Sequence, residues 1–425
     1  MNNKQHRRQF IKNSAIIGSS LLLPGKLLAS LSSPIDSDRK VKLGVIGVGS
    51  RGKYLIQIIH SLGENNPFEI VAVCDNYEPN YQKALKLTGS KAKGFYDYRK
   101  LLEVKDLDAV IVATPLYQHA HIVIDALEAG VHVFCEKAMA RTLEDTKKMA
   151  DAFYRTGKIL HIGHQRLFDP KYLKGLEMVH QGKLGTITQM RAYWHRNNDW
   201  RRKVPSDKPE LERQINWRLY KEYSCGLMTE LASHQIQVAN WAKQTIPVSV
   251  QGVGSINYWK DGREVYDNVA LIYSYADGTQ FIYDSMTSNR HYGLQEQIMG
   301  PKGTLELETN TFFSENPPSP PKPAGILQLI TDIEKGIFET VPIGGASWLP
   351  ETEVKYKGET VAQGNGTDGT PEQLKAFGKA VIDNKPIPGL FEHGYHASVW
   401  TLLGQEAMDS RKVMTLPDDM KLSNQ

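Results

Sequence analysis

Apolar positions follow two different patterns along the chain. From Lys40 to about Thr156, short continuous apolar runs alternate with stretches compatible with helices, such as those over 79–88 and 119–129. Runs that are apolar at every position are typical of strands buried on both faces of a parallel sheet. These runs are KLGVIGV, EIVAVCD, DAVIVAT and HVFCEKA. The pattern predicts a doubly wound α/β (Rossmann) domain over residues 40–160.

After about Gly163 the apolar runs become longer and partly alternating, and turns such as Ala276-Asp277-Gly278 separate them. Alternation favours an open, mostly antiparallel sheet with one solvated or ligand-facing side, over residues 161–370. A proline- and glycine-rich stretch from Asn316 to Pro350 is expected to be a surface excursion. Two helices, about Pro371 to Asn384 and Glu392 to Ser410, are expected to close the chain within residues 371–417. The fold class is therefore α/β followed by α+β.

The first 32 residues are typical of an export signal. Arg7 and Arg8 precede an apolar run from Ala15 to Leu23, and small residues follow near Ala29. The run is shorter than the roughly 20 residues that cross a bilayer. A twin-arginine signal is expected, which would place the mature protein in the periplasm. A basic Sec-type signal is the alternative. No later segment has the length or apolarity of a membrane span.

Charge and composition exclude several classes of protein. The net charge of +4 originates in the leader, because the first 40 residues hold seven basic and two acidic side chains, leaving 44 basic and 45 acidic in the rest. Nothing therefore indicates nucleic acid as a partner. Three cysteines without paired spacing indicate neither a disulfide framework nor zinc, and the thirteen histidines show no ligand spacing, so no metal is expected.

The run KVKLGVIGVGSRG contains Gly47-x-Gly49-x-x-Gly52 between a predicted strand and a predicted helix. In a dinucleotide site Gly47 permits the tight turn, Gly49 admits the pyrophosphate, and Gly52 allows the helix to pack on the strand. Asp75 ends the next strand, 23 residues after Gly52, where an acid binds the ribose. Its carboxylate would repel a 2′-phosphate, so NAD is favoured over NADP. An ordinary glycine turn in a βαβ unit is the alternative.

The second half of this domain reads ATPLYQHAHIVIDALEAGVHVFCEKAMA, and it resembles the Gfo/Idh/MocA oxidoreductases. The matching residues are Thr114, Pro115, His119, Ala126, Leu127, Ala129, Gly130, His132, Val133, Glu136 and Lys137. A later CGLMTELASH segment resembles the family's third motif, with Glu230 in place of the usual Asp and His234 retained. Leu116 and Ala138 depart from the usual Asn and Pro. The resemblance covers most of the chain from Lys40 to about Pro417.

The resemblance implies roles for individual residues. Lys137 would stabilise a hydroxyl or a developing oxyanion, and His234 would accept the hydroxyl proton. Glu230 lies four residues before His234 on an expected helix, so it would orient His234 or hold a second hydroxyl. Cofactor contacts are expected from Ser50 and Arg51 at the pyrophosphate loop, and from Thr114, Pro115, His119, Glu136, Lys137 and Gln165 elsewhere. A solvated charge is the alternative for Lys137 or Arg51 taken alone.

Candidate substrate residues lie farther along the chain. Arg166, in GHQRLFDPKY, would face the substrate, although a structural salt bridge is equally consistent with it. The segments AYWHRNNDWRR and INWRLYKEYSCG are rich in aromatic, Asn and Arg side chains, which suit a carbohydrate. From them His195, Trp200 and Tyr223 are the substrate-binding candidates. Half of this group could instead belong to the core or to a subunit interface.

Together these features predict an exported NAD-dependent oxidoreductase that acts on a secondary hydroxyl of a sugar or glycoside. A 3-keto-glycoside is the favoured product. Tightly held NAD, an electron acceptor, a partner lyase or hydrolase and a homodimer or homotetramer are expected with it. The first alternative is a redox-neutral, NAD-dependent glycosidase that oxidises, eliminates, adds water and reduces again. A second alternative is a non-catalytic sugar sensor, which retention of both Lys137 and His234 disfavours.

Overall fold

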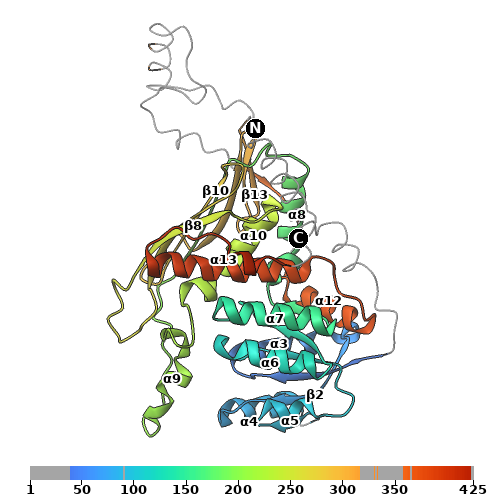
Figure 1. Ribbon diagram of the computed structural model, residues 1–425. Helices are drawn as coiled ribbons and strands as arrows, with labels where there is room; N and C mark the ends of the chain where they lie inside the picture. Colours follow the sequence, from blue (N-terminus) through green and yellow to red (C-terminus); the bar gives the residue numbers. More distant parts are fainter. Residues whose placement is uncertain are drawn as a thin grey trace.

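The computed structural model describes residues 39–89, 91–315, 330, 333, 358–363 and 366–422. The predicted leader lies outside these residues, as does nearly all of the predicted surface excursion from Asn316 to Pro350. The described chain forms two sheets, each with helices packed against it (Figure 1).

The first sheet has six parallel strands in the order β3-β2-β1-β4-β5-β6, which confirms the predicted Rossmann domain. Its strands are β1 (Val41–Ile46), β2 (Phe68–Cys74), β3 (Lys93–Phe95), β4 (Ala109–Val112), β5 (His132–Cys135) and β6 (Leu160–Ile162). The connecting helices are α3 (Ser50–Ser61), α4 (Glu78–Leu87), α5 (Tyr98–Leu102), α6 (His119–Glu128) and α7 (Leu143–Thr156). Strand order reverses between β1 and β4, and open α/β sheets bind ligands beside such a reversal, at the carboxyl ends of the strands.

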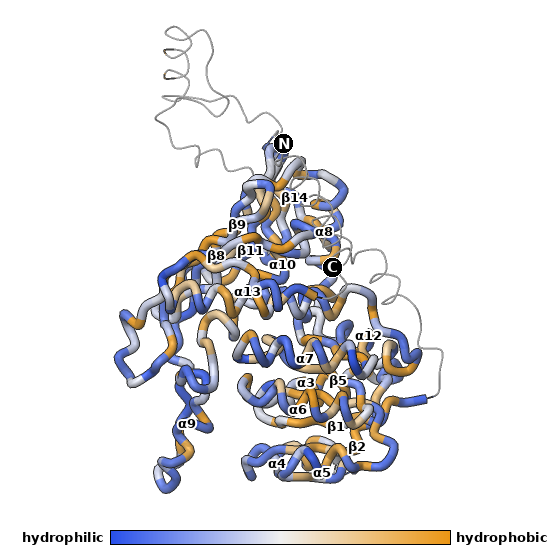
Figure 2. Tube along the Cα trace, in the orientation of Figure 1, coloured by the Kyte–Doolittle hydropathy of each residue, from blue (hydrophilic) through white to orange (hydrophobic). Residues whose placement is uncertain are grey.

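Continuous apolar strands explain why this sheet is covered on both faces. Every residue of β4 and β5 is buried, including the apolar Val110, Ile111, Val133 and Phe134, which are fully excluded from solvent. In Figure 2 the hydrophobic segments of β1, β2 and β5 lie inside the more hydrophilic helices. Burial of these side chains stabilises the sheet by about 1.5–3 kcal/mol for each large apolar residue.

The second sheet has eight strands in the order β14-β13-β12-β11-β7-β10-β9-β8. They are β7 (Gln189–His195), β8 (Ser249–Ser255), β9 (Asn268–Ser274), β10 (Gln280–Met286), β11 (Leu294–Gly300), β12 (Gly303–Glu306), β13 (Thr311–Ser314) and β14 (Glu359–Thr360). All neighbouring pairs are antiparallel except β7 and β10, which are parallel. The predicted mostly antiparallel sheet is confirmed, and β7–β10 is its one parallel pair among the described strands.

Helices α8 (Pro170–His180), α10 (Ser233–Lys243) and α13 (Leu390–Ser410) pack on one side of the second sheet, and α13 crosses the middle of the molecule in Figure 1. Helix α12 (Thr370–Ile382) returns to the first sheet, where Phe377 stacks on Phe68 and meets the edge of Phe134. The sequence pattern predicted both closing helices but did not show that the first of them completes the core of the nucleotide domain.

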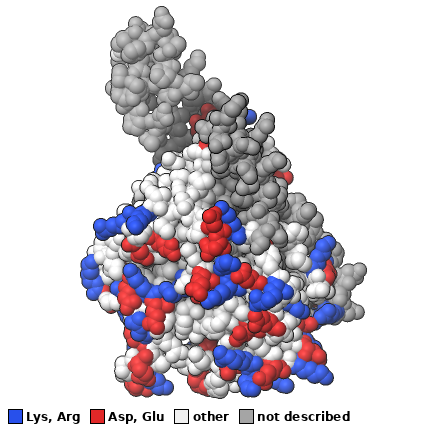
Figure 3. All heavy atoms as spheres, viewed as in Figure 1, with Lys and Arg blue, Asp and Glu red and all other residues white. Residues whose placement is uncertain are grey.

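Charges of both signs are interspersed over the face of the molecule shown in Figure 3. Within the part of the chain that the structure describes, no helix is both long and apolar enough to cross a membrane. The same residues contain no group of three or more His, Cys, Asp or Glu side chains that could hold a metal ion.

Candidate active site

The candidate site lies at the carboxyl edge of the parallel sheet. Gly47 follows β1, Thr114 follows β4, Lys137 follows β5 and Gln165 follows β6. Two neighbouring cavities open there, and Thr114 lines both. One, of about 300 Å³, is lined by Gly47 and Asp75; the other, of about 230 Å³, is lined by Lys137 and His234. A groove thus runs from the predicted ribose-binding acid to the predicted catalytic pair.

The glycine loop has the close backbone contacts that a phosphate-binding turn requires. Gly47 has φ of +85°, and a Cβ there would lie 2.6 Å from the Thr114 nitrogen. A Cβ on Gly52 would lie 2.1 Å from the carbonyl oxygen of Gly47. Above Gly49, by contrast, a Cβ would meet only the Asn80 amide at 3.6 Å, so the loop is open on the side that faces a ligand.

Helix α3 begins directly after this loop. No side chain caps its start, and its first turn carries no acidic residue. The first backbone N–H groups of a helix attract anions, so this start suits a pyrophosphate. Ser50 is the first helical residue and is exposed, whereas Arg51 turns toward the second cavity.

Asp75 links the glycine loop to the end of β2. Its carboxylate accepts hydrogen bonds from the backbone N–H groups of Val48 at 2.9 Å and Tyr77 at 2.8 Å. Burial raises the pKa of Asp75, and these N–H groups oppose the rise. The carboxylate is thereby held at the wall of the first cavity, where a ribose hydroxyl could donate to a remaining lone pair.

Among the buried polar atoms at the groove that lack a partner in the described structure are Thr114 Oγ1 and Gln165 Oε1. Both residues line the second cavity. A buried polar atom without a hydrogen bond costs about 1–3 kcal/mol. These atoms, the open glycine loop and the uncapped helix therefore fit a dinucleotide, whose ribose and amide groups could supply the missing hydrogen bonds.

Lys137 joins the two domains. Its Nζ donates to the backbone carbonyls of Glu230 at 2.8 Å and Thr229 at 3.3 Å. Burial lowers the pKa of Lys137, while the carboxylates of Glu230 and Glu136 oppose this effect. The Lys137–Ala138 peptide is cis even though alanine occupies the position of the family's proline. An ammonium has three N–H donors, so one of them remains for a substrate oxygen.

His234 is a buried imidazole suited to accept a proton. The ring lies edge-on to His164, with centroids 5.7 Å apart, and 5.9 Å from the ring of Trp194. Its Nδ1 has no partner among the described residues. Burial, followed by the charges of Lys137 and Arg166, lowers the pKa of His234 well below its usual range. The neutral form therefore predominates near pH 7, as a general base requires.

The expected single α-helix carrying Glu230 and His234 is wrong in one respect. Glu230 lies in a π-helical turn, Met228–Ala232, and His234 lies in α10, which follows it. The Glu230 carboxylate bonds to Arg218 Nε at 2.6 Å. Arg218 and Lys137 keep the pKa of Glu230 low although burial alone would raise it. Glu230 therefore holds Arg218, which stacks on Trp217. Among the described contacts, the Glu230 carboxylate forms no hydrogen bond with His234.

Arg51 and Glu136 form an ion pair of 2.6 Å on the wall of the second cavity. Burial alone would lower the pKa of Arg51, but Glu136 raises it above its ordinary value. His119 also lines this cavity, and its two ring nitrogens lie 3.0 Å from the carbonyls of Thr114 and Ala138. The imidazole therefore braces the loops that carry Thr114 and Lys137. Pro115 lies at the first cavity.

Arg166 is not among the residues that line the two cavities, and it forms a salt bridge of the kind given as the alternative. The guanidinium is buried and pairs with Glu296 and, at 3.1 Å, with Glu308. Tyr172 Oη lies within hydrogen-bond distance of both carboxylates, 2.6 Å from Glu296 and 2.7 Å from Glu308. Burial alone would lower the pKa of Arg166, but Glu296 leads a net rise. The network fastens the start of α8 to β11.

The other three substrate candidates also lie outside the cavity-lining residues. His195 bonds to Asp284 and packs near Tyr193 and Tyr292, on the face of β7 opposite Trp194, because side chains alternate along a strand. Trp200, with φ of +60°, packs against the core. Tyr223 lies against Tyr117, with ring centroids 4.7 Å apart, beside the loop that follows β4.

Sequence reasoning missed two of the polar and aromatic residues that line the second cavity. Trp217 belonged to the aromatic group noted in the sequence but was not singled out, and Arg218, next to it, was not noted. The segment INWRLY shows no periodicity that would distinguish a cavity residue from a core residue. The buried neighbour His164 was also missed, although it lies two residues before Arg166 in a segment considered for the site.

Comparison with known families gives matches over most of the two domains. Residues 41–164 match the model described as "Oxidoreductase family, NAD-binding Rossmann fold", and residues 172–306 match the "GFO/IDH/MocA C-terminal domain". Together these two matches cover more than half of the chain.

Curated relatives include both oxidoreductases and glycosidases. An α-N-acetylgalactosaminidase of Shewanella oneidensis is 25% identical over 355 residues, which cover 73% of this chain and 75% of the relative. An uncharacterised oxidoreductase of Bacillus subtilis is 24% identical over 66% of this chain and 80% of its own. An inositol 2-dehydrogenase of Salmonella typhimurium is 32% identical over 34% of this chain and only 43% of its own length.

Solved structures share the fold. A levoglucosan dehydrogenase in complex with NADH and levoglucosan aligns with a TM-score of 0.67 at 20% identity, covering 89% of this chain and all of the other. An oxidoreductase domain protein from Kribbella flavida aligns with a TM-score of 0.70 at 21% identity, with the same coverage. At these identities the likeness concerns the fold alone.

Proposed function

Because the chain belongs to the GFO/IDH/MocA oxidoreductase family, we propose that it is an NAD-dependent dehydrogenase that oxidises a secondary hydroxyl of a sugar or glycoside. One observation carries the proposal: Lys137 and the buried His234 line the same cavity, next to a groove that fits a dinucleotide. A cation and a neutral base in one cavity are what removal of a hydroxyl proton requires.

The proton chemistry follows from the contacts of the two side chains. The remaining N–H of Lys137 donates to the substrate hydroxyl oxygen and stabilises the negative charge that develops on it. His234, neutral because of burial and the neighbouring cations, accepts the hydroxyl proton. Bound NAD supplies the hydride acceptor for the carbon that bears this hydroxyl. Glu230 and Arg218 neutralise each other beside Lys137 and keep the cavity polar.

A carbohydrate suits the walls of the second cavity. Trp217 offers an aromatic face for C–H groups, while Arg218 and Gln165 offer polar groups for hydroxyls. Relatives that act on levoglucosan and inositol support the same substrate class. We propose a 3-keto-glycoside as product. A ketone acidifies the neighbouring C–H, so a partner lyase or hydrolase could then eliminate the glycosidic substituent.

The Asp75 carboxylate favours NAD over NADP, and tight retention of NAD follows from export, because a periplasmic enzyme cannot draw on the cytoplasmic pool. Export itself is proposed from Arg7, Arg8 and the apolar run that follows them. Reoxidation of bound NADH then needs an electron acceptor that reaches the protein.

Self-association is proposed for the open face of the second sheet. Tyr193, His195 and Tyr292 contact one another on this side, and Tyr292 is 67% exposed. Of the three, His195 is buried and Tyr193 is half-buried, so Tyr292 is the aromatic side chain that burial against another protein surface would cover. A homodimer or homotetramer through this face agrees with the family resemblance.

The test is absorbance at 340 nm. The protein is purified without added nucleotide and mixed with a panel of glucosides, galactosides and disaccharides. A rise at 340 nm identifies reduction of bound NAD by a glycoside. A response to phosphorylated or nucleotide-linked sugars alone contradicts the proposal. His234→Ala should abolish the rise while sugar binding persists, whereas a sugar sensor would have no turnover to lose.

The redox-neutral glycosidase is the second candidate, and the α-N-acetylgalactosaminidase relative, aligned over 73% of this chain, favours it. Here the oxidised intermediate loses the glycosidic substituent, water adds, and the hydride returns to the sugar. It predicts release of free sugar without a lasting rise at 340 nm, and incorporation of solvent deuterium at the carbon next to the oxidised position. Absence of both observations would exclude it.

A further inference from the structure

One segment of the second domain reaches the nucleotide groove. It runs from Asn197, which forms a bridge with Ser288 at the end of β10, to Asn216, and includes the short helix α9 (Glu212–Ile215). In Figure 1 α9 descends from the second domain beside the nucleotide domain. We call residues 197–216 the strap.

We propose that the strap closes over the bound dinucleotide and that Arg202 binds its pyrophosphate. This inference rests on the proposed function only in that the chain binds a dinucleotide. It assigns a cofactor contact to the second domain, outside the glycine loop.

The far end of the strap contacts the first cavity. Gln214 Nε2 donates to Asn76 Oδ1 at 3.2 Å. Asn76 follows Asp75 and lines the same cavity. The strap is therefore attached to the nucleotide domain next to the ribose-binding acid, about where a dinucleotide would enter or leave the groove.

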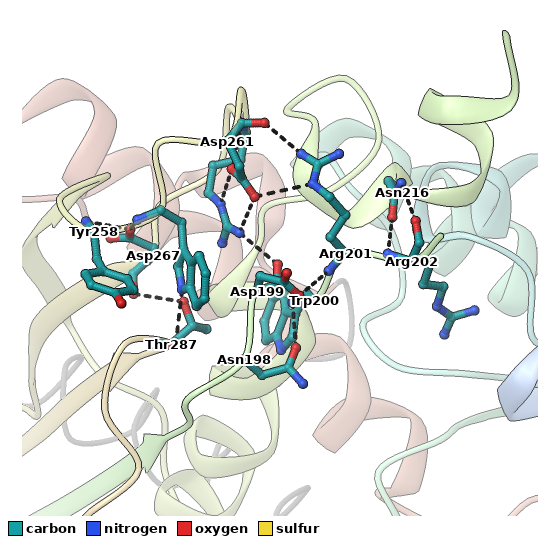
Figure 4. Close-up of polar contacts among 12 residues, drawn as sticks. Asn198, Asp199, Trp200, Arg201, Arg202, Asn216, Tyr258, Asp261, Asp267 and Thr287 are labelled. Atoms are coloured by element: carbon teal, nitrogen blue, oxygen red, sulfur yellow. Dashed lines mark hydrogen bonds and ion pairs between the residues drawn. The ribbon is translucent and has the colours of Figure 1, made fainter. Parts of the chain in front are cut away.

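The backbone of Arg202 is held in place by a buried amide. Asn216 Oδ1 accepts from the Arg202 N–H at 2.6 Å, and Asn216 Nδ2 donates to the Arg202 carbonyl at 3.1 Å (Figure 4). Asn216 is itself 2% exposed, and Nδ2 also donates to Glu212 at 3.0 Å. This clamp fixes where the Arg202 side chain starts and reduces the entropy that it loses on binding.

The neighbouring arginine is used differently. Arg201 turns into the protein, where it pairs with Glu212 and with Asp261 at 3.4 Å and donates to the Asp261 carbonyl at 2.9 Å. Arg263 pairs with Asp261 at 2.8 Å from the other side and donates to the carbonyl of Asp199, also at 2.8 Å. The strap is thus anchored through Arg201 to the hairpin between β8 and β9, as Figure 4 shows.

The guanidinium of Arg202 points away from this cluster (Figure 4), and no hydrogen bond or ion pair to another described residue is recorded for it. It interacts electrostatically with Lys53, in the first turns of α3, and with Arg218 and Glu230, at the second cavity. The exposed Arg202 side chain is therefore within electrostatic range of both the first turn of α3 and the second cavity.

Charge in this space favours an anion. Arg202 interacts electrostatically with Lys53 on one side and with Arg218 on the other, and burial together with neighbouring cations lowers the pKa of both Lys53 and Arg202. Glu230 already pairs with Arg218. A pyrophosphate lies at the start of the helix that follows such a loop, and a guanidinium matches phosphate oxygens with two parallel hydrogen bonds. Binding the anion would remove the repulsion among the cations.

The test measures cofactor retention, separately from turnover. Arg202→Gln and, as a matched control, Lys203→Gln are purified without added NAD. Lys203 is the next residue of the strap and is exposed, and its side chain forms no hydrogen bond or ion pair with another described residue. Arg202→Gln should lose NAD at least about tenfold faster on dilution, as expected for loss of a charge-assisted contact. Lys203→Gln should match the wild type. Gln214→Ala, which releases the far end, should also speed the loss.

The identity of the anion is tested with ADP-ribose and adenosine. Arg202→Gln should weaken the binding of ADP-ribose by a similar factor. The affinity for adenosine, which has no phosphate, should be unchanged. Equal rates of NAD release from Arg202→Gln and wild type overturn the inference. It is also overturned if Arg202→Gln weakens only the binding of an acidic sugar and leaves dinucleotide binding unchanged. If the wild type binds no dinucleotide at all, the proposed function itself fails, so the two failures are distinguishable.

Discussion

Lys137 donates a hydrogen bond of 2.8 Å to the backbone carbonyl of Glu230, 93 residues later in the chain. This contact connects the edge of the parallel sheet to the π-helical turn of the second domain. The turn presents both the Glu230 and the Thr229 carbonyl to one ammonium. The position of the Lys137 ammonium therefore depends on both domains, and π-helical turns often mark functional sites.

Replacement of Lys137 with Met should lower turnover by about 10²–10⁴-fold, because the developing negative charge loses its donor. NAD content should be unchanged, since the cofactor-binding loop is elsewhere. Turnover is measured from absorbance at 340 nm and NAD content after denaturation. A variant with normal turnover would show that Lys137 only joins the domains.

The rate of glycoside oxidation should fall on the acidic side only at a pH well below 6.5. Oxidation needs neutral His234 and charged Lys137. The pKa of His234 lies well below 6.5, so activity should rise with pH below 6.5 and be on its plateau at neutral pH. The pKa of Lys137 is lowered from 10.5, so activity should fall again before pH 10.5. Initial rates across this range test both limbs. A single acidic limb above pH 7 would contradict the assignment of His234.

Asp75→Ser should weaken the binding of NAD by about tenfold or more and reduce the preference for NAD over NADP. The ribose loses an acceptor, the repulsion of a 2′-phosphate disappears, and the N–H groups of Val48 and Tyr77 lose their common partner. Dissociation constants for both nucleotides measure the effect. Asp106→Asn, at an exposed carboxylate of the same domain, is the control and should leave both constants unchanged.

Arg166→Met should reduce the free energy of unfolding by about 3–5 kcal/mol, because Glu296 is left buried without its cation. Denaturation by urea measures this loss. For comparison, Arg155→Met removes an exposed pair with Glu128 and should cost less than about 1 kcal/mol. A variant of normal stability with a raised KM would instead support the original expectation that Arg166 faces the substrate.

The sequence pattern predicted those parts of the protein that are determined by residues close together in the chain. Continuous apolar runs predicted the parallel sheet, and the glycine spacing with Asp75 predicted the groove. Lys137 and His234 meet in one cavity, as the resemblance implied. Each of these features depends on a short stretch of residues or on the order of strands.

The contacts that sequence reasoning could not decide depend on distant parts of the chain. Arg166 is buried because β11 and the turn after β12 bring Glu296 and Glu308 to it. Nothing near Phe377 shows that α12 packs on the first sheet. His195 is different: alternation along the strand separates it from Trp194, but the side facing the site could not be known before the sheet was assembled.

The long helix α13 contacts α10 and β8 of the second domain and α7 and β6 of the first. Its residues Tyr395, Val399, Trp400 and Leu403 belong to one core that both domains share. Rotating the domains apart would expose this core to water, so a hinge between them is costly. Exchange of nucleotide should then proceed by displacement of a surface segment, and heating should unfold both domains in one cooperative transition.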